Sequence, residues 1–443
     1  MIRILFTLLI TLLMANSSFG QQTVSLTLGE AQDYAVKNGF SVRNSRHDAK
    51  SAELQSDELL GIGLPQINAS VQYQNYIDLP TSIVPGDFVG TPGQDLLIKF
   101  GVPQQMTAGL SVSQLLFDGS WLVGLQASRS YAKLMEQQIK KSELDIRREV
   151  AESYHLVLIA QKNVVLLEDG RGVLQETLTQ TSALLKEGFV EEQDVDQLQL
   201  SLNEWDNRIS NARAQLRLTF DLFKFTIGMP LQTDVTLAST SEELMASGSA
   251  DLTTAEFNPD SSIEVQLAQS GLGMQELNLK NKKAGFLPNM AAFYNLQSQA
   301  LRREFNFTDT SQPWFPIQLW GVQLNMPILS GGSRSKSVQK AQVEVNRMNE
   351  TVTYTREAMQ LEYNSSRTAY LNATAIYKSS MESYSLSQKI LNRTSIKFRE
   401  GVASSFDVSQ ATSQSLQSQG AYVQAMLDLM NTKTRFQKVL NQL

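Results

Sequence analysis

The sequence predicts an α+β protein made of two tandem copies of one unit, in which two strands lead into a long helix and a shorter helix follows. Three observations support this prediction. Short motifs occur twice in the same order, apolar residues recur at every seventh position, and apolar and polar residues alternate in the segments between. A period of seven is typical of coiled-coil helices, and a period of two is typical of half-exposed strands.

The two copies are defined by motifs whose spacing agrees between the halves. Gly119 and Gly188 are 69 positions apart, and Gly331 and Gly401 are 70 positions apart. Each motif is weak alone, but an ordered set at matched spacing indicates a duplicated unit. We therefore expect a first repeat at 21–228, a linker or equatorial segment at 229–262, and a second repeat at 263–443. The motif pairs are Leu64–Ile67 with Leu287–Met290, Leu116–Gly119 with Ile328–Gly331, and Lys186–Gly188 with Arg399–Gly401.

Long coiled-coil helices are predicted between these motifs. The segment from Gly119 to Gly188 and its counterpart in the second half contain no proline. As a single helix, each would be about 100 Å long at ~1.5 Å per residue, with Gly170 and Gly172 as points where the first could bend. Helices of about 40 residues should follow, and their strict seven-residue repeat favours a left-handed supercoil. After Gly188 the heptad positions are Val195, Leu202, Ile209, Leu216 and Phe223, with Leu198, Trp205 and Ala212 three residues further on.

Four strands are predicted where the period changes to two. Ile67, Val71 and Tyr73, for example, alternate with uncharged polar residues. This pattern suits the wall of a membrane barrel, and an ordinary half-buried hairpin on a soluble sheet has the same pattern. Four strands are too few to close a membrane barrel, and an open edge in lipid leaves backbone groups unpaired. Strands that lie in a membrane would therefore need several chains to share one barrel.

The composition excludes several classes of protein. The absence of cysteine removes disulfides, thiolate metal sites and a cysteine nucleophile, and a net charge of −6 disfavours nucleic acid as a partner. The two histidines, His47 and His155, are expected to be polar residues on helix faces rather than ligands. The sequence has no metal-ligand spacing, phosphate-binding glycine loop or nucleophile–His–acid set, so we expect no enzyme, cofactor or metal.

The first twenty residues predict export. They combine Arg3, an apolar run from Ile4 to Met14, and small residues at Ser18 and Gly20. This arrangement is typical of a secretory signal peptide at 1–20, because the apolar run is too short to span a bilayer. No later stretch reaches 18 consecutive apolar residues, so no transmembrane helix is expected.

Taken together, the motifs resemble those of the TolC-like outer-membrane efflux proteins. The resemblance rests on the duplicated Leu-Pro turns, on Phe117–Ser120 and Leu329–Gly332 at the starts of the long helices, and on the Gly-x₅-Asp-Val turns. It covers 24–443 and implies a homotrimer in the outer membrane with a large periplasmic portion. Twelve strands would form a shared transmembrane β-barrel, and twelve helical columns would form a periplasmic α-barrel tunnel.

The resemblance also implies partners and a function. The partners are outer-membrane lipid, a periplasmic adaptor protein and an inner-membrane transporter. The function is that of an exit duct for a tripartite efflux pump or a type I secretion system, with no chemistry of its own. A secreted coiled-coil scaffold or adhesin stalk is the alternative that the helix pattern alone leaves open.

In the family, the tunnel closes at the periplasmic turns between the long and short helices. Asp407 matches the first position of an acidic ring, whereas Gln410 stands where the next acid is expected. Phe398 replaces an expected tyrosine hydroxyl, so the closed state should depend more on apolar contacts. Asp194 is the corresponding acid of the first repeat, with a role in gating or in helix capping. The residues expected to contact an adaptor are Gly188, Phe189, Val190, Gly401, Val402 and Ala403.

Overall fold

The computed structural model describes residues 24–85, 87, 90, 93–246, 252 and 256–443. The expected signal peptide at 1–20 lies outside the described residues. The described residues divide into two compact units, one within 24–49, 135–269 and 351–443 and the other within 50–134 and 270–350. Each unit combines segments from both expected repeats, so the repeat boundaries remain predictions, and the units are described separately.

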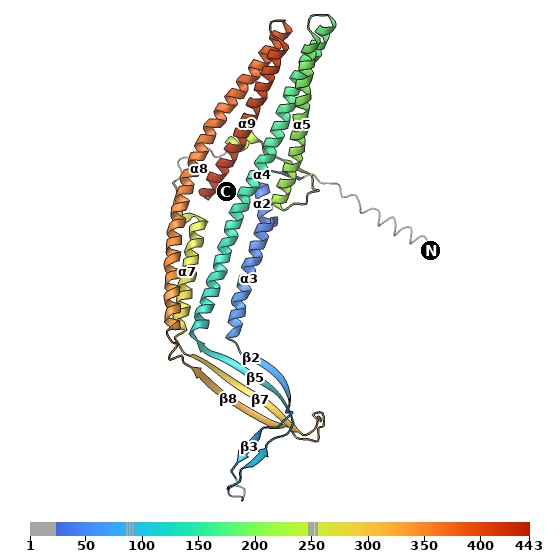
Figure 1. Ribbon diagram of the computed structural model, residues 1–443. Helices are drawn as coiled ribbons and strands as arrows, with labels where there is room; N and C mark the ends of the chain where they lie inside the picture. Colours follow the sequence, from blue (N-terminus) through green and yellow to red (C-terminus); the bar gives the residue numbers. More distant parts are fainter. Residues whose placement is uncertain (1–23, 86, 88–89, 91–92, 247–251, 253–255) are drawn as a thin grey trace, which may run out of the picture. The chain divides into compact units, whose positions relative to one another are not determined.

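The second unit contains a four-stranded antiparallel sheet (Figure 1). Its strands are β2 (Gln66–Asn75), β5 (Gln104–Asp118), β7 (Asn289–Arg302) and β8 (Phe315–Asn325), in the order β2-β5-β7-β8. The four strands predicted from the period of two are therefore present, and β2 and β8 form the two edges of the sheet.

The register of the sheet separates an apolar face from a largely polar one. Residues directly opposite each other share a face, so Ile67, Val112, Tyr294 and Trp320 lie together. The opposite face is polar along β2, β5 and most of β7, as the alternation predicts. The first half of β8 departs from the pattern. Its residues on the otherwise polar face are apolar, namely Phe315, Ile317 and Leu319.

The sheet leads into two long helices, α4 (Gly119–Lys186) and α8 (Ser333–Arg399). Trp121, at the start of α4, donates its indole N–H to the carbonyl of Leu59 in α3 (Phe40–Ile62) at 2.8 Å. Gly63 leaves room for this ring, since a Cβ there would lie 2.2 Å from Trp121 Cζ2. On the other side, Asn281 of α7 (Ile263–Ala284) donates to the carbonyl of Ser120 at 2.7 Å. These bonds hold the start of α4 against both shorter helices of this unit.

The first unit contains the shorter helices α2 (Leu28–Asn38), α5 (Glu192–Ile227) and α9 (Ser405–Val439). Its core is built around Tyr154 of α4, which is fully buried edge-to-face against Phe223. The Tyr154 hydroxyl donates to the carbonyl of Leu26 at 2.9 Å and accepts from the N–H of Ser239 at 3.1 Å. The Tyr154 hydroxyl therefore bridges the two strands of a small parallel sheet at their carboxyl ends, and the sequence did not predict this sheet.

That small sheet is a parallel pair of β1 (Val24–Leu26) and β6 (Val235–Leu237). The segment that contains β6 also contains the short helix α6 (Ser241–Ala246) and the 3₁₀ turn η2 (Pro259–Ser261). The segment 229–262 is therefore partly structured. The side chain of Lys433, on α9, donates to the carbonyls of Leu244 and Met245 and so ties α6 to α9.

The heptad pattern predicted for α5 is confirmed by burial, because most of its seam positions are buried. Trp205 is 2% exposed and donates its indole N–H to the carbonyl of Leu167 on α4 at 2.6 Å. Gly170 does not end or interrupt α4; it makes room for this ring, since a Cβ there would lie 2.3 Å from Trp205 Cζ2. The buried seam residues of α5 are Leu198, Leu202, Trp205, Ile209 and Phe223.

Within the described part of the chain, none of the helices is long and apolar enough to cross a membrane.

Candidate functional site at the helical tips

The turn between α4 and α5 exposes an apolar side chain at its apex. Gly188 adopts a left-handed conformation with φ of 76°, which a glycine adopts without steric cost. The N–H groups of Gly188 and Phe189 donate to the carbonyls of Leu185 and Leu184, both at 3.0 Å, and so close the end of α4. Phe189 is 76% exposed, whereas Val190 is half-buried.

The turn between α8 and α9 repeats this geometry. Gly401 has a φ of 72°, and its N–H donates to the carbonyl of Phe398 at 3.0 Å. Val402 donates its N–H to the carbonyl of Lys397 at 2.8 Å, and its side chain is 76% exposed. Ala403 is half-buried against the apolar cluster below the turn. Each turn therefore presents one exposed apolar side chain directly after a left-handed glycine.

Asp407 is held at the start of α9 by a reciprocal helix cap. Its carboxylate accepts from the backbone N–H and from the hydroxyl of Ser404, both at 2.8 Å. The Ser404 hydroxyl in turn accepts from the N–H of Asp407 at 3.2 Å. This is a capping box, and the bonds from Ser404 lower the pKa of Asp407 because they favour the ionised carboxylate. The side chain is exposed and makes no ion pair within the described part of the chain.

The other predicted gate residues differ in their surroundings. Asp194 accepts from the N–H of Glu191 at 3.1 Å, which confirms a capping bond at the start of α5. Gln410 is exposed on α9. Phe398 is only 6% exposed and packs with Val408 and other apolar residues of α4 and α5. The structure thus brings Phe398 and Ala403 into one apolar cluster, while Asp407 and Gln410 face solvent in the single chain.

One exposed apolar residue at the tip was missed from the sequence. Phe406 lies in the first turn of α9 and is 69% exposed. The available signal was its place between the capping residues Ser404 and Asp407. A large apolar residue there lies outside the buried heptad positions of α9, so it is expected to be exposed. Phe406 and Val402 are therefore two apolar side chains at the same turn.

Below the tip, α9 is buried by two chemically different sets of residues. The half next to the tip buries mostly polar side chains, together with Val408 and Ala411. In the part of the chain that the structure describes, Thr412 Oγ1 and both amide atoms of Gln419 are buried without a hydrogen-bond partner. The other half buries mostly apolar side chains, together with Lys433 and Thr434. The polar set is Ser405, Thr412, Ser415 and Gln419, and the apolar set includes Ala425, Met426, Leu429, Met430 and Phe436.

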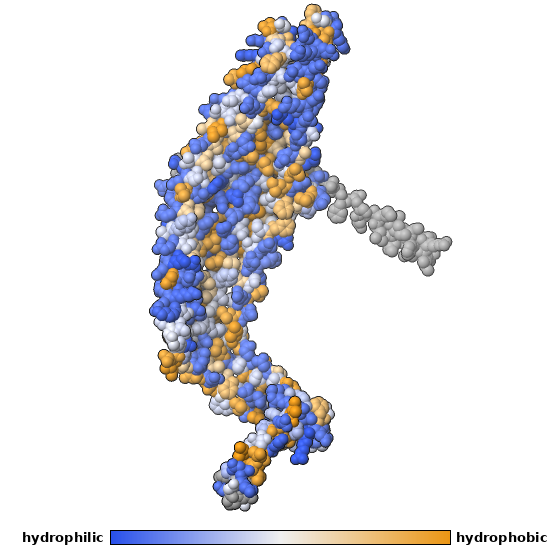
Figure 2. Space-filling view, viewed as in Figure 1, coloured by the Kyte–Doolittle hydropathy of each residue, from blue (hydrophilic) through white to orange (hydrophobic). Residues whose placement is uncertain are grey.

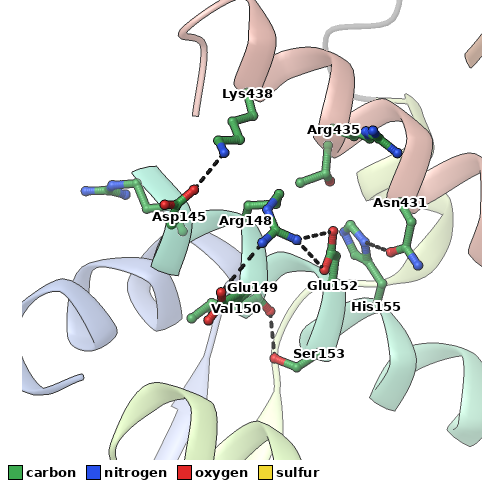
Figure 3. Close-up of polar contacts among 12 residues, drawn as sticks. Asp145, Arg148, Glu149, Val150, Glu152, Ser153, His155, Asn431, Arg435 and Lys438 are labelled. Carbon is green, nitrogen blue, oxygen red and sulfur yellow. Dashed lines mark hydrogen bonds and ion pairs between the residues drawn. The ribbon is translucent and has the colours of Figure 1, made fainter. Parts of the chain in front are cut away.

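The end of α9 far from the tip carries a network of ion pairs (Figure 3). Lys438 contacts Asp145 of α4 at 2.6 Å and Glu264 of α7 at 4.0 Å. Burial alone would raise the pKa of Asp145, but hydrogen bonds from Lys438 and Lys141 outweigh it and lower that pKa. Arg148 pairs with Glu152 at 2.8 Å in the same region. Several of these residues line a pocket of about 560 Å³, where Arg148 pairs with Glu152 and Arg435 pairs with Glu362. Because its charged groups are paired with one another, we interpret this pocket as a structural junction rather than a ligand site.

His155 lies next to this network, and its predicted place on a polar helix face is wrong. The ring is 3% exposed, and Nδ1 lies 3.1 Å from Oδ1 of Asn431 (Figure 3). Burial lowers the pKa of His155 to about 4, with a further lowering from nearby Lys433. A single histidine on a heptad-patterned helix gave no signal that it would face inward. The structure places His47 on the surface, as expected. Among the described residues, no group of three His, Cys, Asp or Glu side chains is arranged to hold a metal ion.

The combination of long paired helices, an open four-stranded sheet and apolar helical tips defines a class, the outer-membrane channels with a helical tunnel. Residues 33–220 match the family model described as outer membrane efflux protein, so this segment belongs to that family. The resemblance to TolC-like outer-membrane efflux proteins is thereby confirmed. A comparison with curated protein sequences found no match.

The fold of nearly the whole chain is shared with solved outer-membrane channels. Structures of CusC share 13% identity at a TM-score of 0.72, with 96% of this chain and 95% of that chain covered. CmeC from Campylobacter jejuni shares 14% identity at a TM-score of 0.70, with 96% of this chain and 90% of that chain covered. VceC from Vibrio cholerae shares 15% identity at a TM-score of 0.68, with 93% of this chain and 95% of that chain covered. At these identities the likeness shows the fold, and it agrees with the family match.

These findings confirm several expectations. The chain is an outer-membrane efflux channel with a large periplasmic portion. Because the matched family consists of ducts and not of enzymes, the expectation that the chain has no enzymatic activity is confirmed as well.

Proposed function

We propose that three copies of this chain form the outer-membrane exit duct of a tripartite efflux pump or a type I secretion system. The duct passes substrate from a periplasmic adaptor and an inner-membrane transporter to the exterior. The proposal extends the channel function, which the family match supports, to a specific assembly and a specific pathway.

The number of copies is supported by the edges of the sheet. In one chain, β2 and β8 have a neighbouring strand on one side only. Unpaired backbone groups are not tolerated in hydrocarbon, so the edges need partners if the sheet lies in the membrane. Pairing β8 of one copy with β2 of the next closes a ring, and three copies give twelve strands with the apolar face outward.

The two halves of the chain are proposed to be structural repeats within this ring. The element order α3, β2, β5, α4, α5 recurs as α7, β7, β8, α8, α9. Both tips have the same left-handed glycine, exposed apolar residue and capped helix start. Six similar tips per trimer would then surround the periplasmic entrance.

The observation that carries the adaptor contact is the exposure of Phe189 and Val402. Each side chain is about three-quarters exposed at the apex of a turn whose backbone bonds are already satisfied. Apolar side chains that gain nothing from their own chain mark a protein contact surface. We propose that they dock against the periplasmic adaptor, with Gly188, Val190, Gly401 and Ala403 shaping the two turns.

The gate is proposed to lie at the same tips. Three copies of Asp407 would place three carboxylates around the entrance, where they would bind cations. In this chain the carboxylate also caps α9, so one residue has both a structural and an electrostatic role. Gln410 adds no second ring of charge. Phe398 contributes apolar packing behind the turn, and Asp194 contributes a cap in the first half.

The proposal is tested by photocrosslinking in cells that carry the native pump components. Because the chain has no cysteine, Phe189→Cys and Val402→Cys each give a single site for a benzophenone maleimide. We expect membrane-bound trimers on a mild gel and light-dependent adducts with an adaptor from both sites. The matched control is Asn364→Cys on the exposed side of α8, which should give no adaptor adduct. Trimers that form adaptor adducts only from Asn364→Cys would overturn the assignment of the tips, and a soluble rod would favour the stalk alternative.

A further inference from the structure

The segment between β2 and β5 forms a separate two-stranded ribbon. Strand β3 (Thr81–Val84) pairs antiparallel with β4 (Leu96–Lys99), and neither strand belongs to the four-stranded sheet (Figure 1). Backbone bonds close its base, from Tyr76 N–H to the Pro103 carbonyl at 2.7 Å and from Phe100 N–H to the Pro80 carbonyl at 3.3 Å. We call β3 and β4 together the exit ribbon.

The exit ribbon carries an apolar pair on each face, and its polar residues are Thr81, Ser82 and Lys99 at the base. Ile83 and Leu97 are paired directly, so they share one face, where they are 64% and 71% exposed. Val84 and Leu96 form the next pair and lie on the opposite face, with Leu96 also exposed. Figure 2 shows apolar side chains, in orange, on the surface of this ribbon. An isolated two-stranded hairpin is marginally stable in water, and one with two exposed apolar faces needs a partner.

Membrane lipid does not fit as this partner. A ribbon of two strands has two open edges, and neither β3 nor β4 pairs with another strand of the described chain. In hydrocarbon these edges would leave backbone N–H and C=O groups without hydrogen bonds. The ribbon therefore requires an occupant that supplies both apolar side chains and backbone partners, which is a protein strand.

A second copy of the same chain is the occupant that the topology favours. The ribbon follows directly from β2, which is the edge strand that the proposed ring pairs with a neighbouring copy. It is thus continuous with the proposed interface between copies. A neighbouring exit ribbon offers the same apolar faces and the same open edges, so like surfaces can cover each other.

We propose that the exit ribbons of adjacent copies pack together as a collar at the exterior end of the channel. This inference rests on the proposed trimer and adds an interface to it. The collar covers Ile83 and Leu97 of each copy, and it makes the outer end of the trimer a protein contact rather than a set of independent loops.

The experiment uses the full-length protein in outer membranes, with the single-site variant Leu97→Cys carrying a benzophenone maleimide. The matched control is Thr310→Cys, an exposed position in the loop between β7 and β8. We expect light-dependent adducts of twice the chain mass from Leu97→Cys and few from Thr310→Cys. Labelling of Leu97→Cys by a membrane-impermeant maleimide should be at least about tenfold slower than labelling of Thr310→Cys, because a covered side chain reacts only when its contact opens. The two rates should become equal after the trimer is dissociated by heat.

Three outcomes would overturn the inference. Adducts with lipid would show that the ribbon lies in the membrane, and adducts with a different protein would assign the surface to an external partner. Equal and fast labelling of both variants would show that the ribbon is uncovered. If trimers are present in these cases, only the collar fails. If no trimers form, the proposed assembly fails together with it.

A double variant, Ile83→Ser with Leu97→Ser, should keep the trimer but lose the slow labelling of a cysteine placed at Ser82.

Discussion

Acid should destabilise the helical part of this protein through one buried side chain, His155. The pKa of this ring is lowered to about 4 from its ordinary value of 6.5, because burial and the neighbouring Lys433 disfavour the imidazolium. Above pH 6.5 the ring is neutral in the folded and unfolded chains and contributes no pH dependence. As the pH falls from 6.5 toward 4, the unfolded chain binds a proton that the folded chain does not, so stability is lost across this window.

The size of the effect follows from the difference between the two pKa values. One unit of pKa corresponds to about 1.4 kcal/mol, so the full window is worth about 3 kcal/mol, as an upper value. The matched variant is His155→Gln, whose amide can still donate to Asn431 but does not titrate. Other groups titrate alike in both proteins, so the difference between them isolates the histidine.

The measurement is urea unfolding of detergent-purified protein at a series of pH values, followed by tryptophan fluorescence. Trp205 is buried in the same unit and reports on its unfolding. Between pH 6.5 and 4 the wild type should lose about 3 kcal/mol more stability than His155→Gln. Parallel loss in the two proteins across this window would refute the reasoning, because it would mean that the ring is charged or exposed in the folded chain.

Three further predictions concern the seam and the tip. Trp205→Ala should lower the free energy of unfolding by about 3–5 kcal/mol, as measured by urea unfolding followed by circular dichroism, because it removes a large buried ring and leaves the Leu167 carbonyl unpaired. Gly170→Ala should cost about 1–3 kcal/mol in the same assay, because the new Cβ would collide with that ring, and an unchanged midpoint would contradict the contact. Asp407→Asn should weaken cation selectivity and divalent block in planar-bilayer conductance. The control Ser404→Ala should weaken the α9 cap by about 1 kcal/mol and leave the selectivity unchanged. An unchanged conductance response of Asp407→Asn would remove this residue from the gate.

Much of the architecture was predictable because it depends on local periodicity. A seven-residue repeat is a property of one helix, and Leu198, Leu202 and Phe223 are buried as the repeat predicts. The alternation of the strands likewise reports which side chains share a face. The turns were predictable because left-handed backbone favours glycine, as Gly188 and Gly401 demonstrate.

Features that depend on contacts distant in the sequence were not predictable. The pairing of β1 with β6 joins residues more than 200 positions apart, and each strand has only three residues. The inward orientation of His155 depends on Asn431 of α9, which no local pattern reveals. The sequence marks Gly170 only as a point where α4 could bend, because its partner, Trp205, lies on another helix. The roles of Asp407 and Gln410 at a gate remain predictions, because a ring of side chains exists only between copies.

The change in chemistry along α9 should give the helix a gradient of local stability. Between Ser405 and Gln419 most of its buried side chains are polar, and water that enters this part can form bonds with the buried atoms of Thr412 and Gln419 that have none in the folded chain. Between Ala425 and Phe436 most of the buried side chains are apolar, so water there would mainly separate apolar surfaces, which is unfavourable. Backbone amides near the tip should therefore exchange hydrogen through small, frequent openings, and those near the far end only when the whole unit unfolds. The part of α9 near the tip would then open and hydrate readily, while the part near Phe436 stays packed in the core. The tip could rearrange without unfolding the rest of the helix.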